Sequence, residues 1–288
     1  MLYVGTSGWQ YRHWRGTFYP PKLPQARWLD HYTERFRTVE VNNTFYHLPE
    51  ASTFDGWRRR TPDDFVLAVK MSRFLTHLKR LKDPGEPVER FMSRARKLGP
   101  KLGPVLIQLP PQMEAEPERL AETLELIPAG TRVAVEFRHQ SWFKDQVFEI
   151  LNEHGATLCL ADSPRRKTPE IRTADWGFVR VHEGRATPRP CYGQRALESW
   201  VERLHGLFGP EADLYAYFNN DWRACAIRDA VVFAHLAAKA GFAVSRVPRL
   251  DDVSLGLSCP LDPPTLPSPL RGEECRGLVS PFRTALFF

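Results

Sequence analysis

Apolar and polar side chains alternate in several short stretches of the chain. The clearest stretch starts at residue 133 and reads VAVEFRHQSW. Its apolar residues Val133, Val135 and Phe137 share one face of an extended strand, because side chains alternate with period two. The other face ends in Glu136 and Arg138. A charge is costly to bury unless it is paired or hydrogen-bonded, so two charges at the downstream end of a strand indicate a working site.

The same pattern predicts eight strands: Leu2–Ser7, Thr38–Asn42, Phe65–Lys70, Val105–Leu109, Arg132–Phe137, Thr157–Asp162, Phe178–His182 and Leu214–Asn219. Helical periodicity separates several of them, most clearly in an apolar stripe between Leu197 and Phe208. Eight strands alternating with helices over about 250 residues are typical of an α/β fold of the (β/α)8 TIM type. A doubly wound sheet is the competitor, but no GxGxxG turn follows the first strand.

Two segments depart from this repeat. No helical pattern occupies the chain between Asp162 and Phe178, so we expect the barrel to be irregular between strands six and seven. Residues 258–288 are proline-rich and aperiodic, which is typical of a disordered or loosely packed tail. We therefore expect a barrel domain over residues 1–250 and an appended tail over residues 251–288.

Charge and cysteine content narrow the function classes. The chain carries a net charge of +6, and the first 250 residues carry more positive charge than the whole because the tail is acidic. Such a charge favours anionic partners at long range, although ordinary solvated surface charge explains it equally well. Five scattered cysteines without a CxxC pair argue against a disulfide framework and a cysteine-rich zinc site, and favour a reducing compartment. We see neither a signal peptide nor a membrane-spanning apolar run, so the expected location is cytoplasmic.

The polar residues at the strand ends form the candidate site. In a barrel the intervening aliphatic residues would face the helices, and the strand-end residues would point into the upper barrel, where such enzymes place catalytic groups. The strand-end residues are Ser7, Glu40, Asn42, Lys70, Gln108, Glu136, Arg138, Asp162, Arg180, His182 and Asn219.

The segments after these strands add aromatic, basic and amide groups. The further candidates for ligand binding are Trp9, Tyr11, Trp14, Phe45, Tyr46, His77, Trp142 and Asn220. Basic groups interleaved with aromatic rings suit a single-stranded nucleic acid or another polyanion. The alternative for any one residue is that the ring caps the barrel and the base is a solvated loop charge.

Several longer stretches together indicate a family. They are GTSGWQYRHWRGTFYP, TVEVNNTFYHLP, THLKRL, LGPVLIQLPP, VEFRHQSW, ADSP, VRVH and YFNND, in this order between Leu2 and Gly241. They resemble the domain of unknown function 72 (YecE-like) family. The resemblance implies a TIM-type barrel but no particular reaction. The likeness of that family to metal-dependent endonuclease and sugar-isomerase barrels suggests nucleic acids by analogy alone. The chain after about Ser258 lies outside the family pattern.

The candidate catalytic residues are Glu40, Glu136, Asp162 and His182. Glu40 and Glu136 are two carboxylates of the kind that glycoside hydrolysis uses. Glu136, Asp162 and His182 have donor atoms that suit a divalent metal. The neighbouring cations would compete for the carboxylates, so we predict no metal and no other cofactor, with a divalent ion left open. A ring of salt bridges that closes the barrel is the structural alternative.

The sequence thus predicts a polar pocket that binds an anionic small molecule or a single-stranded nucleic acid through a phosphate, and no membrane. Lys70, Arg138 and Arg180 would supply the charge, and arginine matches the two-point geometry of phosphate oxygens. If the protein is an enzyme, we expect a hydrolase acting on a phosphate ester or a glycosidic bond. The alternatives are a non-catalytic binder of nucleic acid or a metabolite, and a glycoside-type hydrolase using Glu40 and Glu136.

Overall fold

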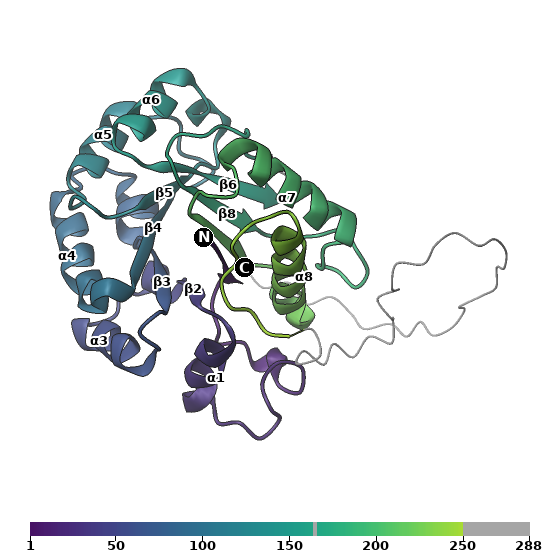
Figure 1. The fold of residues 1–288 in the computed structure, drawn as a ribbon. Helices are drawn as coiled ribbons and strands as arrows, with labels where there is room; N and C mark the ends of the chain where they lie inside the picture. The colour runs from purple at the N-terminus through teal and green to yellow at the C-terminus, as the bar shows by residue number, and fades with distance from the viewer. Residues whose placement is uncertain (164–165, 250–288) are drawn as a thin grey trace, which may run out of the picture. The chain divides into compact units, whose positions relative to one another are not determined.

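Eight parallel strands form a nearly closed barrel, and helices alternate with them along the chain (Figure 1). The computed structural model describes residues 1–163 and 166–249. The barrel strands are β1 (Leu2–Thr6), β2 (Thr38–Val41), β3 (Val66–Lys70), β4 (Leu102–Gln108), β5 (Val133–Glu136), β6 (Thr157–Ser163), β8 (Gly177–Val181) and β9 (Leu214–Phe218). All eight predicted strands and the TIM-type barrel are confirmed.

The strands follow the order β1-β9-β8-β6-β5-β4-β3-β2 around the barrel. A parallel bridge between Ser7 and Glu40 joins the two ends of this order, β1 and β2. At Gly5 an added Cβ would lie only 2.4 Å from the carbonyl oxygen of Thr38. The two strands therefore approach so closely at this point that only glycine fits.

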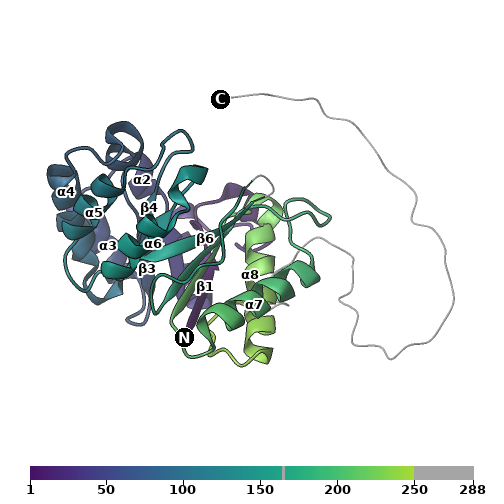
Figure 2. The same cartoon turned by 90° about the horizontal axis from the view of Figure 1, so that it is seen from above.

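Apart from the short α2 at the end of β2, the helices lie along the outside of the strands in both views (Figures 1 and 2). The helices are α1 (Trp28–Arg35), α2 (Asn43–Tyr46), α3 (Ala51–Arg60), α4 (Gly85–Ala95), α5 (Pro117–Glu125), α6 (Asp145–Glu153), α7 (Gln194–Phe208) and α8 (Cys225–Lys239). The stripe predicted from Leu197 to Phe208 is the buried face of α7. Apolar residues that recur with a period of 3.6 form one face of a helix, and that face packs on the sheet.

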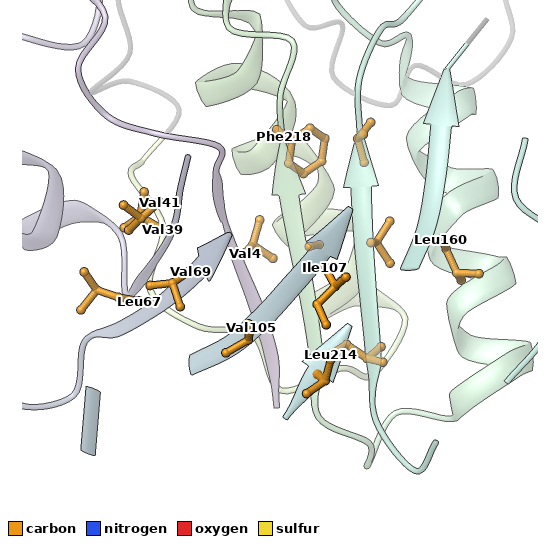
Figure 3. Packing of buried hydrophobic residues seen from close by; sticks show 14 of the residues in the cluster. Val4, Val39, Val41, Leu67, Val69, Val105, Ile107, Leu160, Leu214 and Phe218 are labelled. Carbon is orange, nitrogen blue, oxygen red and sulfur yellow. The ribbon is translucent and has the colours of Figure 1, made fainter. Parts of the chain in front are cut away.

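The barrel strands separate two apolar layers. Aliphatic residues such as Val39, Leu67 and Ile107 form the layer between the strands and the helices, part of which is drawn in Figure 3. Val133 and Val135 belong to this outer layer, as the alternation predicts. The inner layer is a separate cluster, half of it aromatic, that fills the barrel interior: Ala68, Leu106, Ala134, Cys159, Trp176, Phe178, Tyr215 and Tyr217.

The predicted irregularity between the sixth and seventh barrel strands is confirmed. In the described part of this connection no helix forms, and β7 (Arg166–Lys167) instead pairs antiparallel with the end of β6. Further along, the Thr173 hydroxyl accepts a hydrogen bond from the Leu158 amide and donates one to the Ala156 carbonyl, both at 2.9 Å. The connection therefore runs beside β6 where a helix would otherwise lie.

The sequence argued against a disulfide framework and did not predict the single disulfide that joins Cys191 and Cys225. They lie 34 residues apart in sequence, so spacing gave no sign of the pair. The loop after β8 meets the start of α8, where the Tyr192 amide donates to the Asp229 carboxylate at 2.8 Å and brings the two cysteines together.

The tail predicted over residues 251–288 lies outside the described residues, so its packing stays a prediction. Among the described helices, none is both long and apolar enough to cross a membrane.

Candidate functional site

A pocket of about 450 Å³ opens at the carboxyl ends of the barrel strands. Its lining residues come from most of the strands or the segments that follow them: Tyr11, Asn42, Phe45, Tyr46, Lys70, Arg73, His77, Gln108, Arg138, Arg180 and Asn219. Volumes of about 300–1,000 Å³ are usual for small-molecule sites. This end of the barrel is where TIM-type proteins hold their ligands.

The floor of the pocket is a buried ion-pair group made by Glu40, Glu136 and Arg180. The Arg180 guanidinium donates to both Glu40 oxygens at 2.8 Å, through Nε and Nη2. Its Nη1 donates to Glu136 Oε2 at 2.5 Å. Glu40 is 0% exposed, and Arg180 and Glu136 are each 2% exposed. A single guanidinium therefore hydrogen-bonds both buried carboxylates. The second positive charge needed to balance them comes from Arg138, whose Nε donates to Glu136.

The wall of the pocket consists of Lys70, Arg73, Gln108 and Arg138, and it holds most of the cations. The Gln108 amide donates to Glu136 Oε2 at 2.8 Å, and its oxygen accepts from Lys70 Nζ at 2.8 Å. Arg138 Nε donates to Glu136 Oε1 at 2.9 Å. Lys70 Nζ lies 4.0 Å from the centre of the Phe45 ring. The wall thus connects to the floor through one amide and one guanidinium.

Lys70 is the most perturbed cation of the wall. Burial, with Arg180 as the next cause and Arg138 adding to it, lowers the pKa of Lys70 to about 7, although Glu40 and Glu136 oppose this shift. Both the ammonium and the neutral amine are therefore populated at neutral pH. For Glu136, burial would raise the pKa, but Arg180, His182 and Arg138 outweigh it and hold the pKa well below its usual range. Glu136 is thus a carboxylate at any physiological pH.

Two histidines at the site stay neutral. Burial and the neighbouring Lys70 and Arg138 lower the pKa of His77 to about 4. Burial and Arg180 lower the pKa of His182 to about 3. Asn219 Nδ2 lies 3.0 Å from His182 Nδ1 and is the donor, so the proton of neutral His182 sits on Nε2. That Nε2 is 4.0 Å from Glu136 Oε1.

Asp162 does not reach the pocket, and the expectation that it points into the barrel is wrong. Its carboxylate accepts from the indole N–H of Trp200 in α7 at 2.9 Å. Asp162 shares its strand face with Leu160, which belongs to the outer apolar layer. The alternation rule itself therefore places Asp162 on the helix side of β6.

Three tryptophans that the sequence predicted to contact a ligand have structural roles instead. Trp14 is fully buried and its indole donates to the Asp221 carbonyl at 3.0 Å. Trp142 is also fully buried, stacks on Phe137 and donates to the Met113 carbonyl at 2.9 Å. Trp9 packs edge-on against Trp57. None of the three tryptophans lines the pocket.

Three other predicted residues do not line the pocket. Ser7 is buried at the bridge between β1 and β2, with a hydroxyl that has no hydrogen-bond partner among the described residues. Asn220 donates to the Asp229 carboxylate at 2.7 Å, away from the pocket. His182 lies directly behind the lining residue Asn219.

Of the three residues named for a divalent ion, Glu136 and His182 lie close together, but Asp162 does not join them. Asp162 faces α7, and Glu136 is held by two guanidiniums. In residues 1–163 and 166–249, no group of three or more His, Cys, Asp and Glu side chains is arranged to hold a metal ion. The residues present therefore do not fit a metal centre at this pocket.

Arg73 is a lining residue that the strand-end pattern did not select. It lies three residues after Lys70, and the only sequence signal was its place in a basic segment after the third strand. Asn42 also lines the pocket, and its buried Oδ1 has no hydrogen-bond partner among the described residues. The amide oxygen can accept a hydrogen bond from a ligand hydroxyl.

Comparisons with known proteins agree on one family. The family model described as "Protein of unknown function DUF72" matches residues 3–251. UPF0759 protein YunF of Bacillus subtilis is 27% identical over 262 residues, which span 77% of this chain and 89% of that protein. UPF0759 protein YecE of Escherichia coli is 29% identical over 169 residues, 57% of this chain and 60% of that protein.

Solved structures support the same assignment. The crystal structure of a DUF72 family protein (TM1631) from Thermotoga maritima gives a TM-score of 0.73 at 31% identity, over 83% of this chain and 99% of that one. A DUF72 family protein (EF0366) from Enterococcus faecalis gives a TM-score of 0.69 at 17% identity, over 83% and 96%. The second likeness supports the fold alone. With the family model covering nearly the whole barrel, the chain belongs to the DUF72 family.

Proposed function

We propose that the pocket binds a small phosphate-bearing molecule, with the phosphate between Lys70, Arg73 and Arg138. The observation that carries this proposal is the charge balance between floor and wall. Two carboxylates and two guanidiniums cancel within the linked group of Glu40, Glu136, Arg180 and Arg138. Arg73, and Lys70 in its ammonium form, remain as excess positive charge at the pocket. An anion is therefore attracted to the wall without being repelled by free carboxylates.

The shape of the pocket favours a compact ligand with a planar ring. Tyr46 lines the pocket and is 70% exposed, so its ring offers an open face beside the cations. Phosphate matches the fork of donors that arginine presents. A nucleoside monophosphate combines these features and fits a pocket of about 450 Å³. A single-stranded nucleic acid would present the same phosphate and ring chemistry in a longer ligand.

A glycoside hydrolase is the weaker candidate. General acid catalysis by a carboxyl group needs a raised pKa, whereas the pKa of Glu136 is held well below its usual range by the guanidiniums beside it. Glu40 and Glu136 also bind the same guanidinium, so neither is free to attack a sugar or protonate its leaving group.

The test is calorimetric titration with inorganic phosphate, adenosine 5′-monophosphate and adenosine. We expect both phosphates to bind, with an affinity that falls as salt rises because ions screen exposed charges, and adenosine to bind poorly. Arg138→Ala should weaken both phosphates, and Arg195→Ala, a change at an exposed position on α7, serves as the control. Phosphate affinity that does not change with salt concentration, and that is the same in Arg138→Ala and Lys70→Met as in wild type, would overturn the proposal. If an oligonucleotide binds far more tightly than the monophosphate, the ligand is a single-stranded nucleic acid and not a small molecule.

A further inference from the structure

Two lysines of the barrel domain are equally buried but have different surroundings. Lys70 and Lys101 are each 6% exposed. Lys101 Nζ donates to the carbonyl oxygens of Arg58 and Thr61 at 2.8 and 2.6 Å, and it lies 3.6 Å from Asp63. Its amine is thus held by backbone acceptors and is not part of the pocket.

Lys70 has no such set of acceptors. Its Nζ donates to one side-chain oxygen, that of Gln108, and otherwise faces the Phe45 ring. Among the described residues, no carboxylate forms an ion pair with it. Because Lys70 lines the pocket, its amine meets any ligand held there. A buried lysine without a counter-ion, beside two further cations, is the arrangement in which an amine becomes a nucleophile at neutral pH.

We propose that Lys70 forms an imine with the carbonyl carbon of an anionic aldehyde or ketone bound in this pocket. The inference rests on the proposed function, because Arg73 and Arg138 are the anchors for the anionic end of the ligand. It goes further by assigning covalent chemistry and a carbonyl-bearing ligand class to the site.

The bond changes balance without an oxidant or reductant. The neutral Nζ donates its lone pair to the carbonyl carbon, and a proton passes from the resulting cationic nitrogen to the carbonyl oxygen to give a neutral carbinolamine. That hydroxyl then leaves as water after a second protonation, while the nitrogen lone pair forms the C=N bond. The protonated imine carries the same single positive charge as the ammonium form of Lys70, and relative to the neutral amine it has gained one proton from solvent. Gln108 accepts a hydrogen bond from Nζ and so fixes its position during attack.

The electrostatic environment supports this chemistry. Burial and Arg180 lower the pKa of Lys70 to about 7, so a large fraction of the amine is neutral at physiological pH. The charged groups that act on it are Arg180 and Arg138, which favour the neutral amine, and Glu40 and Glu136, which oppose it. An unperturbed lysine, with a pKa near 10.4, is almost entirely protonated under the same conditions.

Pyridoxal 5′-phosphate is a suitable probe because it carries an aldehyde and a phosphate on one ring. The full-length protein is mixed with less than one equivalent of it at pH 7.5, reduced with borohydride, and mapped by peptide mass spectrometry. We expect labelling of Lys70 to exceed that of Lys101 and of each other lysine by at least about tenfold, given the larger neutral fraction of its amine. Excess inorganic phosphate should suppress that label.

Pyridoxine 5′-phosphate separates the two proposals, because it has an alcohol in place of the aldehyde and cannot form an imine. If it binds but pyridoxal 5′-phosphate leaves Lys70 unlabelled, the imine is overturned and the anion pocket stands. If it does not bind, the anion pocket itself fails. Label spread evenly over the lysines, or equal label on a folded Lys70→Met variant, also overturns the imine. The comparison of Lys70 with Lys101 needs no variant, so a folding failure of Lys70→Met does not affect the test.

Discussion

The floor and the wall of the pocket use the same residue types to different effect. In the floor, Arg180 lies between Glu40 and Glu136 and satisfies both with three hydrogen bonds. In the wall, Lys70 and Arg73 face the pocket, and Lys70 is held by an amide and an aromatic ring. With Arg138 included, the carboxylates of the floor are charge-balanced, whereas Lys70 and Arg73 keep excess positive charge at the open pocket.

This difference shows that charge type alone does not identify a catalytic group. From the sequence, Glu40 and Glu136 are the natural acid and base, yet the structure places both on one guanidinium. The wall residues matter for function because the floor has already compensated the carboxylates that would repel an anion. We therefore expect substitutions in the floor to change stability, and substitutions in the wall to change binding.

Arg180→Met should give the largest effect, because it leaves Glu40 and Glu136 buried without their main partner. Breaking a buried ion pair by removing one partner costs about 3–5 kcal/mol. The free energy of unfolding, measured with urea at pH 7, should fall by that amount. A loss of less than about 1 kcal/mol would mean that the floor is not the compensated group described above.

The buried ion pairs of the floor also make the unfolding free energy of the wild-type protein depend on pH. The folded state holds the pKa of Glu136 well below its usual range, so Glu136 contributes stability that is present above its unfolded pKa and is lost as pH falls through the folded value. In a urea series from pH 7 downward, the unfolding free energy should therefore decline below about pH 4.3, the ordinary pKa of a glutamate. Glu136→Gln should flatten this decline.

Arg138→Ala should lower the affinity for adenosine 5′-monophosphate and for inorganic phosphate by about tenfold, the equivalent of 1.4 kcal/mol, because it removes a charge-assisted contact. Stability should change little, since Glu136 keeps its bonds to Arg180 and Gln108. Titration and urea unfolding on the same samples separate the two effects. Equal affinity in wild type and variant, with Arg195→Ala as the reference, would remove Arg138 from the site.

Lys70→Met should raise the unfolding free energy at pH 7.5 by on the order of 1 kcal/mol, because it replaces a poorly compensated buried cation with an apolar chain of similar length. Burial lowers the folded pKa of Lys70 to about 7. The unfolded state therefore binds more protons above that pH, and wild-type stability should rise between about pH 7 and pH 10.4. Urea unfolding at pH 7.5 and 9.5 checks whether Lys70→Met lacks this rise. The same change of unfolding free energy with pH in wild type and variant would contradict the prediction.

Tyr46→Ala should have the smallest effect and the most selective one. The exposed ring can add about 0.5–1 kcal/mol to the binding of a ligand with a planar ring, and it touches no phosphate in our proposal. Adenosine 5′-monophosphate should weaken by a few-fold while inorganic phosphate is unchanged. If both weaken equally, Tyr46 shapes the pocket and does not stack on the ligand.

The fold was largely accessible from the sequence, because strand alternation is a local property. Val133, Val135 and Glu136 occupy the faces that their spacing predicts. Asp162 shows the limit of selecting polar strand ends by type, since the face it shares with Leu160 is the outer one. Tryptophans such as Trp142 are equally ambiguous, because a large ring beside a site can also be its structural support.

The ion pairs inside the site could not be predicted from the sequence. Nothing in the spacing of Glu40, Glu136 and Arg180 says which carboxylate the guanidinium selects, because the three residues lie on β2, β5 and β8 and meet only when the barrel closes. The disulfide between Cys191 and Cys225 was missed for the same reason, since a long-range loop packing brings the two residues together.

The most direct test of the anion site is the proton exchange that accompanies binding of pyridoxine 5′-phosphate at pH 8. At this pH the ligand is already a dianion, because the second phosphate pKa is about 6, and Lys70 is mostly neutral. An anion beside Lys70 favours the ammonium form. Calorimetry in two buffers of different ionisation enthalpy should therefore record uptake of a substantial fraction of one proton by the wild type and none by Lys70→Met. Binding without proton uptake in the wild type, or the same uptake in the variant, would contradict the account.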